Sequence, residues 1–167
     1  NICNLFGFNN GDGTFCPGGS ISNLYAMILA RNIKLKSTDK NNKQLIGFTS
    51  CESHYSIIKN ANIIGINKNN IKKIICDENG CMDTIELEKS INNELKNGNI
   101  PFFINITAGT TVLSSFDDIK KITDIAQKYD IYTHIDGSYG GSYIFSKKHK
   151  YLLNGCENVN SIVLNPH

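Results

Sequence analysis

The chain has 167 residues, with 17 basic and 15 acidic side chains and a formal net charge of +2 at pH 7. This length suits one domain or part of one. Because the charges nearly balance, no field of one sign would attract a nucleic acid or an anionic membrane, and we expect neither as a partner. The start lacks a signal peptide and no window approaches the roughly 18 to 20 apolar residues of a spanning helix, so we expect a cytoplasmic protein.

Six cysteines are scattered along the chain, and none belongs to a Cys-x-x-Cys pair of the kind that zinc and redox sites use. We therefore expect thiols instead of a disulfide framework, and no metal site. The first residue is Asn and the last three are Asn-Pro-His, so we also expect the chain to be a fragment of a longer protein.

The first half of the chain predicts helices and strands in alternation. Residues 20–36 carry apolar side chains at helical spacing behind two glycines, with Ser20 or Ser22 as the candidate N-cap. The next expected elements are a polar loop, a strand, a helix and a strand, over residues 37–43, 44–49, 54–64 and 71–75.

In the second half, Asp83 is placed to cap a helix that begins at Thr84 and ends at Gly98. Residues 101–106 are nearly all apolar, which is typical of a strand buried on both faces. A helix, a strand and a final apolar run follow over residues 117–129, 131–135 and 161–164. Strands that alternate with helices predict an α/β fold with a mainly parallel sheet, because parallel neighbours need a crossover.

Ligands of such sheets bind beyond the carboxyl ends of the strands, so the residues that follow strands are candidates for chemistry. Ahead of the first helix, residues 17–23 place two glycines and a hydroxyl where free backbone amides and the positive end of a helix dipole meet. A phosphate would fit there. An ordinary turn with an N-cap explains the same residues.

Two further segments follow predicted strands. Residues 107–111 offer small side chains and hydroxyls suited to a ligand, although a simple turn has the same composition. Residues 134–141 place Asp136 at the end of an apolar strand, followed by small residues that we expect to leave open space; a loop-bonding aspartate is the alternative. His54 equally suits a surface position at a helix start, and we expect His134 to be a structural histidine.

Taken together, these motifs resemble the group II pyridoxal-phosphate-dependent decarboxylases, which act on glutamate, cysteine sulfinate and aromatic amino acids. The resemblance covers nearly the whole chain, and its acidic-substrate branch is the most similar. It rests on residues 11–23, 53–56, 107–112 with Phe116 and Asp117, 134–141 and 165–167.

The resemblance implies a fold-type I large domain, of which residues 1–167 form a part, and a homodimer with active sites at the subunit interface. By motif, Asp136 would pair with the ring nitrogen of pyridoxal phosphate and His54 would stack on the ring. The phosphate would be held by Gly19, Ser20, Asn165 and His167. Thr110 would lie near the cofactor, and Ser138 stands where relatives commonly have the alanine beneath the ring.

The activity implied is α-decarboxylation of an acidic amino acid, namely cysteine sulfinate, glutamate or aspartate. In the family, the lysine that binds the cofactor covalently follows Asn-Pro-His, where this chain ends. Two alternatives remain: another fold-type I enzyme, such as an aminotransferase or lyase, or a truncated chain without catalytic activity.

Overall fold

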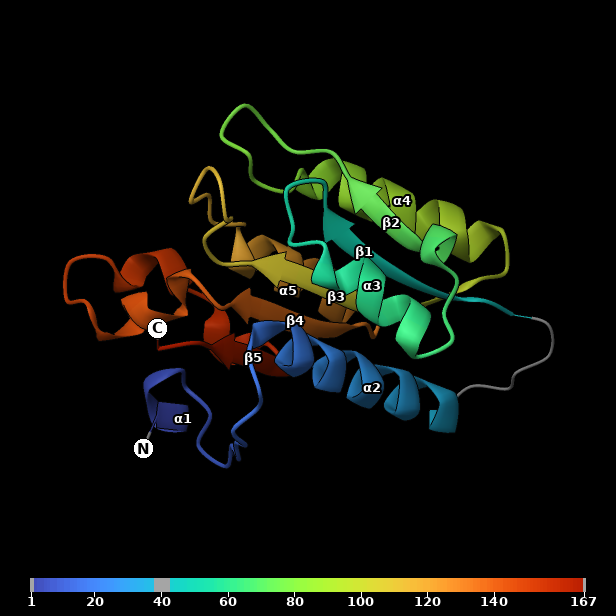
Figure 1. The fold of residues 1–167 in the computed structure, drawn as a ribbon. Helices are drawn as coiled ribbons and strands as arrows, with labels where there is room; N and C mark the ends of the chain where they lie inside the picture. Colours follow the sequence, from blue (N-terminus) through green and yellow to red (C-terminus); the bar gives the residue numbers. More distant parts are fainter. Residues whose placement is uncertain (1, 38–42, 167) are drawn as a thin grey trace.

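The fold is a five-stranded parallel sheet between two layers of helices (Figure 1), and the computed structural model describes residues 2–37 and 43–166. The strands lie in the order β2-β1-β3-β4-β5, and every neighbouring pair is parallel. Their bounds are Leu45–Ser50 for β1, Ile71–Ile74 for β2, Ile100–Thr107 for β3, Tyr132–Gly137 for β4 and Ser161–Leu164 for β5. All five carboxyl ends therefore meet at one edge of the sheet.

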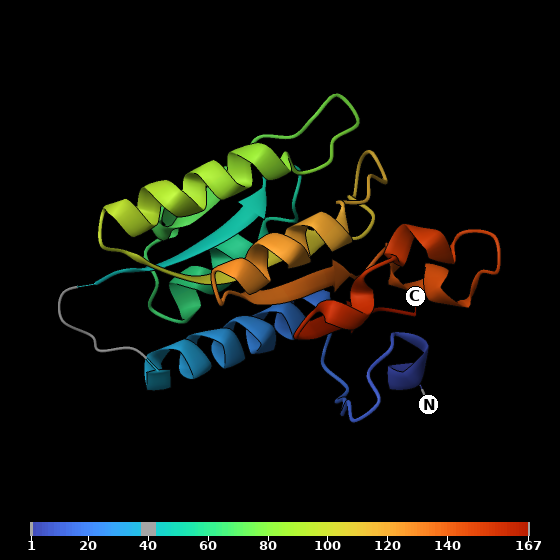
Figure 2. The ribbon, with the colours of Figure 1, turned by 180° about the vertical axis from the view of Figure 1, so that it is seen from behind.

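Two helices cover each face of the sheet. Helices α2 (Gly19–Ser37) and α3 (Ser56–Ile63) pack on one face, and α4 (Thr84–Lys96) and α5 (Ile119–Lys128) lie side by side on the other (Figure 2). The short elements are α1 and the 3-10 helices η1 to η4, over Ile2–Leu5, Lys68–Asn70, Gly140–Phe145, Lys150–Leu153 and Cys156–Asn158. Within the described ranges, the helices are too short or too polar to cross a bilayer.

Each face of the sheet has its own apolar core. Leu87 and Ile91 of α4 are fully buried against the sheet in the core that contains Ile104. On the other face, Met27 of α2 and Ile57 of α3 are fully buried in the core that contains Phe103. Burying an aliphatic side chain of this size stabilises a fold by about 1.5–3 kcal/mol. The two cores fix the sheet and both helix layers relative to each other.

Strand β3 contains one residue more than its neighbour requires. Ile46 of β1 pairs with Pro101, whereas Gly47 pairs with Phe103, so Phe102 is an inserted bulge residue. Because side chains alternate along a strand, the bulge changes which residues of β3 face each helix layer. After it, Asn105 and Thr107 share a face with His134 and Asp136 of β4, their partners in register.

Several sequence predictions are confirmed. Asp83 accepts hydrogen bonds from the backbone N–H groups of Ile85 and Glu86, as an N-cap does. Strand β3 is buried along almost its entire length. Helix α4 ends at Lys96, followed by Gly98 at φ 77°, in the left-handed region that suits a glycine after a helix.

Other predicted boundaries are wrong. Ser20 and Ser22 lie inside α2 and neither caps it, because Gly18 turns the chain at φ 93° and its carbonyl accepts from Ser22 N. Asp117 precedes α5, whose N-cap is Asp118. Strand β4 runs past residue 135 to Gly137, because β3 and β5 pair with it there. Most of the loop predicted over residues 37–43 lies outside the described residues.

Candidate functional site

The carboxylate of Asp136 lies at the end of β4 and is only 6% exposed. Its Oδ2 accepts a hydrogen bond of 2.7 Å from Asn23 Nδ2, and its Oδ1 accepts from the backbone N and the hydroxyl of Ser138, at 3.1 and 2.7 Å. A carboxylate has about four acceptor positions, so one on Oδ2 remains for a further donor. Among the described residues, the recorded ion pairs include none with Asp136.

Asn23, in the first turns of α2, links the Asp136 carboxylate to Ser56 of α3 and to His134 of β4. It is 1% exposed, and its Nδ2 also donates to Ser56 Oγ at 3.1 Å. Its Oδ1 lies 3.0 Å from His134 Nε2, so the amide orientation requires the proton of His134 to be on Nε2. His134 Nδ1 then accepts from the hydroxyl of Ser161 at 2.8 Å. Both ends of Asn23 are satisfied, which fixes the amide.

His134 is neutral in this arrangement. Its burial lowers its pKa to about 4, although the nearby Asp136 carboxylate acts in the opposite direction. The expectation of a structural histidine in a strand agrees with this environment. Because the imidazole carries no charge at neutral pH, it does not neutralise Asp136.

The start of α2 lies beside the same carboxylate. A Cβ added to Gly19 would collide with Ser138 Oγ, so a larger residue here would displace the hydroxyl that donates to Asp136. Gly18 O accepts from Ile21 N and Ser22 N. By position, the N–H groups of Gly19 and Ser20 have no partner within the helix, and the helix dipole adds positive potential there. This end of α2 can bind an anion next to Asp136.

His54 lies in the connection between β1 and α3, not inside the helix as the pattern predicted. Its Nδ1 accepts from Ser56 N at 3.3 Å, and its half-buried ring lies against Tyr55 with centroids 4.3 Å apart. Since Ser56 also bonds to Asn23, His54 is joined to the Asp136 group through two residues.

Thr110 is buried, but its hydroxyl closes its own loop by accepting from Ser115 N at 3.0 Å. The loop touches the Asp136 segment through its backbone: Ala108 N donates to Asp136 O, and Gly140 N donates to Ala108 O. Asn165 follows β5, whose Leu164 pairs with Gly137, so it leaves the sheet at the same edge. His167 lies outside the described residues.

We expected the small residues after Asp136 to leave open space, and this expectation is wrong. A Cβ on Gly137 would lie 2.6 Å from Val163 O, and one on Gly140 would lie 2.5 Å from Ala108 O. These glycines are needed because the backbone of neighbouring segments fills the room that a side chain would take.

Three residues of the site lie in segments that the sequence analysis singled out, but they were given no individual role there. Asn23 and Ser56 complete the hydrogen bonds around Asp136, and Thr107 pairs in register with Asp136 on the adjacent strand. The buried Thr107 Oγ1 has no hydrogen-bond partner among the described residues, so it is available to a ligand at this edge. The helical spacing from Gly19 to Asn23 was the one signal available, because residues four apart share a helix face.

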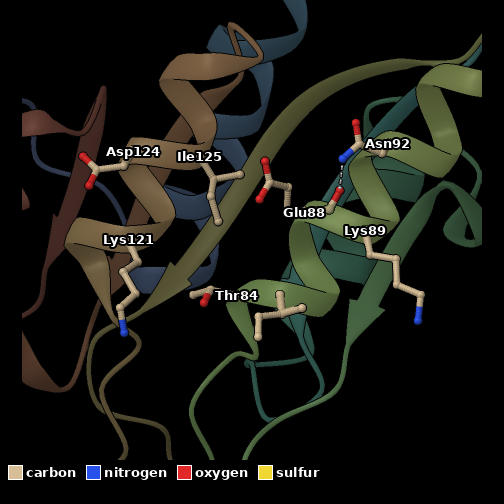
Figure 3. A pocket seen from close by; sticks show the side chains of 8 residues that line it. Thr84, Glu88, Lys89, Asn92, Lys121, Asp124 and Ile125 are labelled. Carbon is tan, nitrogen blue, oxygen red and sulfur yellow. Dashed lines mark hydrogen bonds between the residues drawn. The ribbon is translucent and has the colours of Figure 1, made fainter.

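A groove lies elsewhere, between α4 and α5 on the opposite face of the sheet (Figure 3). It measures about 450 Å³ and is lined by Glu88 and Asn92 of α4 and by Lys121 and Asp124 of α5. Its charged side chains are solvated, and ion pairs in such positions contribute little. In residues 2–37 and 43–166, no three His, Cys, Asp or Glu side chains gather into a metal site. We assign the candidate site to Asp136, not to the groove.

Comparison with known proteins identifies the family of the chain. The model of the family described as "Pyridoxal-dependent decarboxylase conserved domain" matches residues 2–167. The chain belongs to this pyridoxal-dependent decarboxylase family. It is 40% identical over 167 residues to the cysteine sulfinic acid decarboxylase of Rattus norvegicus, covering 98% of the chain and 34% of the relative. The acidic amino acid decarboxylase GADL1 of Homo sapiens is 43% identical over 168 residues, covering 98% and 32%.

The structural comparison confirms the predicted fold type. The crystal structure of mouse cysteine sulfinic acid decarboxylase (CSAD) in its apo form matches with a TM-score of 0.94 and 40% identity, covering 99% of this chain and 36% of the mouse chain. The chain thus spans about a third of the length of these relatives of the pyridoxal-dependent decarboxylase family.

Proposed function

We propose that this chain supplies the cofactor site of a pyridoxal-phosphate-dependent enzyme that removes the α-carboxylate of an acidic amino acid. The observation that carries the proposal is the buried Asp136 carboxylate, which has three donors, an unused acceptor position on Oδ2 and no cationic partner among the described residues. Further support comes from the names of the relatives, which act on cysteine sulfinic acid or on acidic amino acids.

The residues present fit the cofactor. Asp136 Oδ2 has room for the N–H of a protonated pyridine ring, and an adjacent carboxylate stabilises that protonated form. The amides of Gly19 and Ser20 suit the phosphate, with Asn165 and His167 as further ligands. We assign His54 to one face of the ring and Ser138 to the other side, where its hydroxyl also orients Asp136.

Thr107 and Thr110 complete the proposed cofactor site at the end of β3. The unpartnered Thr107 Oγ1 is free to donate to the cofactor, whereas the Thr110 hydroxyl retains a proton after accepting from Ser115 N. When bound, pyridoxal phosphate accepts the electron pair that remains on the α-carbon as CO₂ leaves. Asp136 contributes by holding the ring-nitrogen proton, and Asn23 and Ser138 contribute by holding Asp136.

Three broader assignments belong to the same proposal. Residues 1–167 form part of the cofactor-binding large domain, the active protein is a homodimer, and it works in the cytoplasm. The substrate is cysteine sulfinate, glutamate or aspartate. Size-exclusion chromatography with light scattering on the natural protein tests the dimer directly, and a monomer of full activity would remove that part.

The decisive experiment uses the natural protein that carries this sequence, loaded with pyridoxal phosphate. We expect CO₂ release from at least one of the three acidic amino acids. Asp136→Ala should lower CO₂ release by at least about 10²-fold, because losing one partner of a buried ion pair costs about 3–5 kcal/mol and 1.36 kcal/mol is tenfold in rate. The absorption band of the bound cofactor should shift as well.

Asp124→Ala is the matched control, because Asp124 is an exposed aspartate on α5 that pairs only with Lys120 among the described residues. Its turnover should equal that of the unmodified protein. Asp136→Asn keeps the shape of the side chain and guards against a folding defect. Full turnover and an unchanged spectrum in both Asp136 variants would refute the proposal, and conversion of the substrate to a keto acid without CO₂ would replace it with a transaminase.

A further inference from the structure

Two cysteines meet at the carboxyl edge of the sheet, outside the Asp136 group. Cys51 is the first residue after β1, Cys76 follows the end of the adjacent strand β2, and their Sγ atoms lie 3.2 Å apart. Both are free thiols, and Cys51 is exposed. They are 25 residues apart in the sequence, so the fold alone brings them together.

The backbone holds both cysteines in place. Cys51 N donates to Ile74 O at 2.8 Å, which extends the pairing of β1 and β2 by one residue. Cys76 forms an antiparallel bridge with Met82. A disulfide has an S–S bond of about 2.05 Å, so the two sulfurs need to approach by only about 1 Å. Side-chain rotation supplies such a shift without moving either strand.

We propose that Cys51 and Cys76 form a reversible disulfide whose oxidant is a low-molecular-weight disulfide of the glutathione class. The Cys51 thiolate attacks oxidised glutathione, forming a mixed disulfide and releasing one reduced glutathione. The Cys76 thiolate then attacks Cys51 Sγ, closing the protein disulfide and releasing the second reduced glutathione. The two protein thiols lose two protons and two electrons, and the oxidant gains both as two thiols.

The surroundings of the two sulfurs decide their order of reaction. Cys51 is the exposed sulfur, so it meets the oxidant first. Burial and the hydrogen bond with Cys51 raise the pKa of Cys76 to about 11, so Cys76 is a thiol at neutral pH. The second step requires the Cys76 thiolate, so ring closure should accelerate as the pH rises.

Two of the other cysteines, Cys81 and Cys156, are poorer partners. Cys81 Sγ donates to Phe116 O at 3.1 Å, and burial raises its pKa. Cys156 is buried, and its sulfur lies 3.6 Å from Phe6 O. We therefore expect the disulfide to be specific to Cys51 and Cys76, with Cys81 as the nearest competitor to exclude by mutation.

A disulfide at this position would restrain the connection that leads to His54. Cys51 and His54 belong to the same short segment, in which Ser53 N donates to Ser50 O. Linking Cys51 to the end of β2 fixes the start of that segment. An effect on cofactor binding through His54 rests on the proposed function, whereas formation of the disulfide does not.

The test incubates the natural protein with oxidised glutathione at pH 7 and pH 9, followed by alkylation, proteolysis and mass spectrometry. We expect a linked pair of peptides containing Cys51 and Cys76, reversed by dithiothreitol and formed faster at pH 9. Cys76→Ser should stop at the Cys51–glutathione adduct, and Cys51→Ser should give neither product at this pair. Cys81→Ser should behave like the unmodified protein.

Two results would overturn the proposal: complete alkylation of both cysteines after oxidation, or a stable Cys51–glutathione adduct in the unmodified protein. Divided by the fraction of Cys76 present as thiolate, the closure rate in the folded protein should also be at least about tenfold higher than in the urea-unfolded chain, where a loop of this length must first close. Equal rates would show that the fold does not hold the pair together. Cofactor absorbance of the oxidised protein measures the effect on His54 separately. If the proposed function fails, mass spectrometry still tests formation of the disulfide.

Discussion

The two faces of the sheet differ in what they bury. Beneath α4 and α5 the sheet buries aliphatic and aromatic side chains, and the polar groups of those helices line the solvated groove of Figure 3. On the other face, an aspartate and a histidine of the sheet are buried against an asparagine of α2 in one hydrogen-bonded group. The groove is a hollow lined by solvated side chains, whereas the buried polar group contains the candidate catalytic carboxylate.

The difference is energetic. A buried polar group destabilises a fold unless it is fully hydrogen-bonded, whereas solvated charges have almost no effect on stability. The chain retains Asn23, His134 and Asp136 in its interior despite this cost, whereas the core beneath α4 and α5 consists of apolar side chains. This contrast leads to predictions that pair a residue of the Asp136 group with a matched residue elsewhere.

The largest effect is expected from Asn23→Ala. The change leaves His134 Nε2–H without its acceptor and Asp136 Oδ2 without its donor, and each buried unsatisfied group costs about 1–3 kcal/mol. We expect urea unfolding to show a loss of about 2–5 kcal/mol. The matched variant Asn92→Ala, in the groove, should lose at most about 1 kcal/mol, because Asn92 is only partly buried. Equal losses would contradict the contrast between the faces.

His134 gives the next effect, through pH. Its folded pKa of about 4 lies below the ordinary value of 6.5, so the unfolded chain binds more protons between these values and stability falls as pH drops from about 6.5 to 4. His134→Gln should remove up to about 3 kcal/mol of that decline, at 1.36 kcal/mol per pKa unit. The measurement is urea unfolding across this range, with His149→Gln as the control. Parallel curves for His134→Gln and the unmodified protein would refute the prediction.

The titration of Asp117 changes stability in the opposite direction to that of His134 over the same pH range. Burial raises its pKa to about 6, although Met82 N and Thr107 N both donate to it. Its contribution to stability is present below about pH 4 and is lost as pH rises through 6. The His134 effect must therefore be measured as a difference between variants.

A smaller effect is expected from Thr107→Val. The change removes a buried hydroxyl without a partner, so the cofactor-free protein should gain about 0.5–1 kcal/mol. Affinity for pyridoxal phosphate, measured by absorbance titration, should fall by about fivefold to tenfold, the equivalent of one hydrogen bond. Ser50→Ala removes another buried, unpartnered hydroxyl beside Ile74 and should leave that affinity unchanged. Unchanged affinity in Thr107→Val would remove Thr107 from the site.

The smallest effect is expected from Glu88→Gln, in the groove. Lys128 and Tyr129 donate to this carboxylate and keep its pKa low, but the pair is solvated. Turnover, cofactor affinity and the melting temperature should all equal those of the unmodified protein. A loss of turnover would mean that the α4 and α5 face takes part in the activity.

Local signals in the sequence predicted much of the fold, but they did not predict the hydrogen bonds that join the candidate site residues. The Asp83 cap and the apolar strand β3 depend on neighbours in the chain, so their residues reveal them. Asp136 was identifiable because it ends a strand. The role of Asn23 was not, because its partners His134 and Asp136 lie 111 and 113 residues away. For the same reason, no spacing rule pairs Cys51 with Cys76.

The inserted residue Phe102 decides which side of β3 is polar. If Phe102 paired with Gly47 in an unbroken register and did not bulge, Phe48 would lie opposite Phe103 and not opposite Ile104. Thr107 would then face the apolar core beneath α4 and α5, and an isoleucine would take its place next to the Asp136 carboxylate. Deleting Phe102 itself would keep the present pairing, because Phe103 would then follow Pro101 directly and still lie opposite Gly47. The orientation of Thr107 therefore depends on the bulge conformation of the strand.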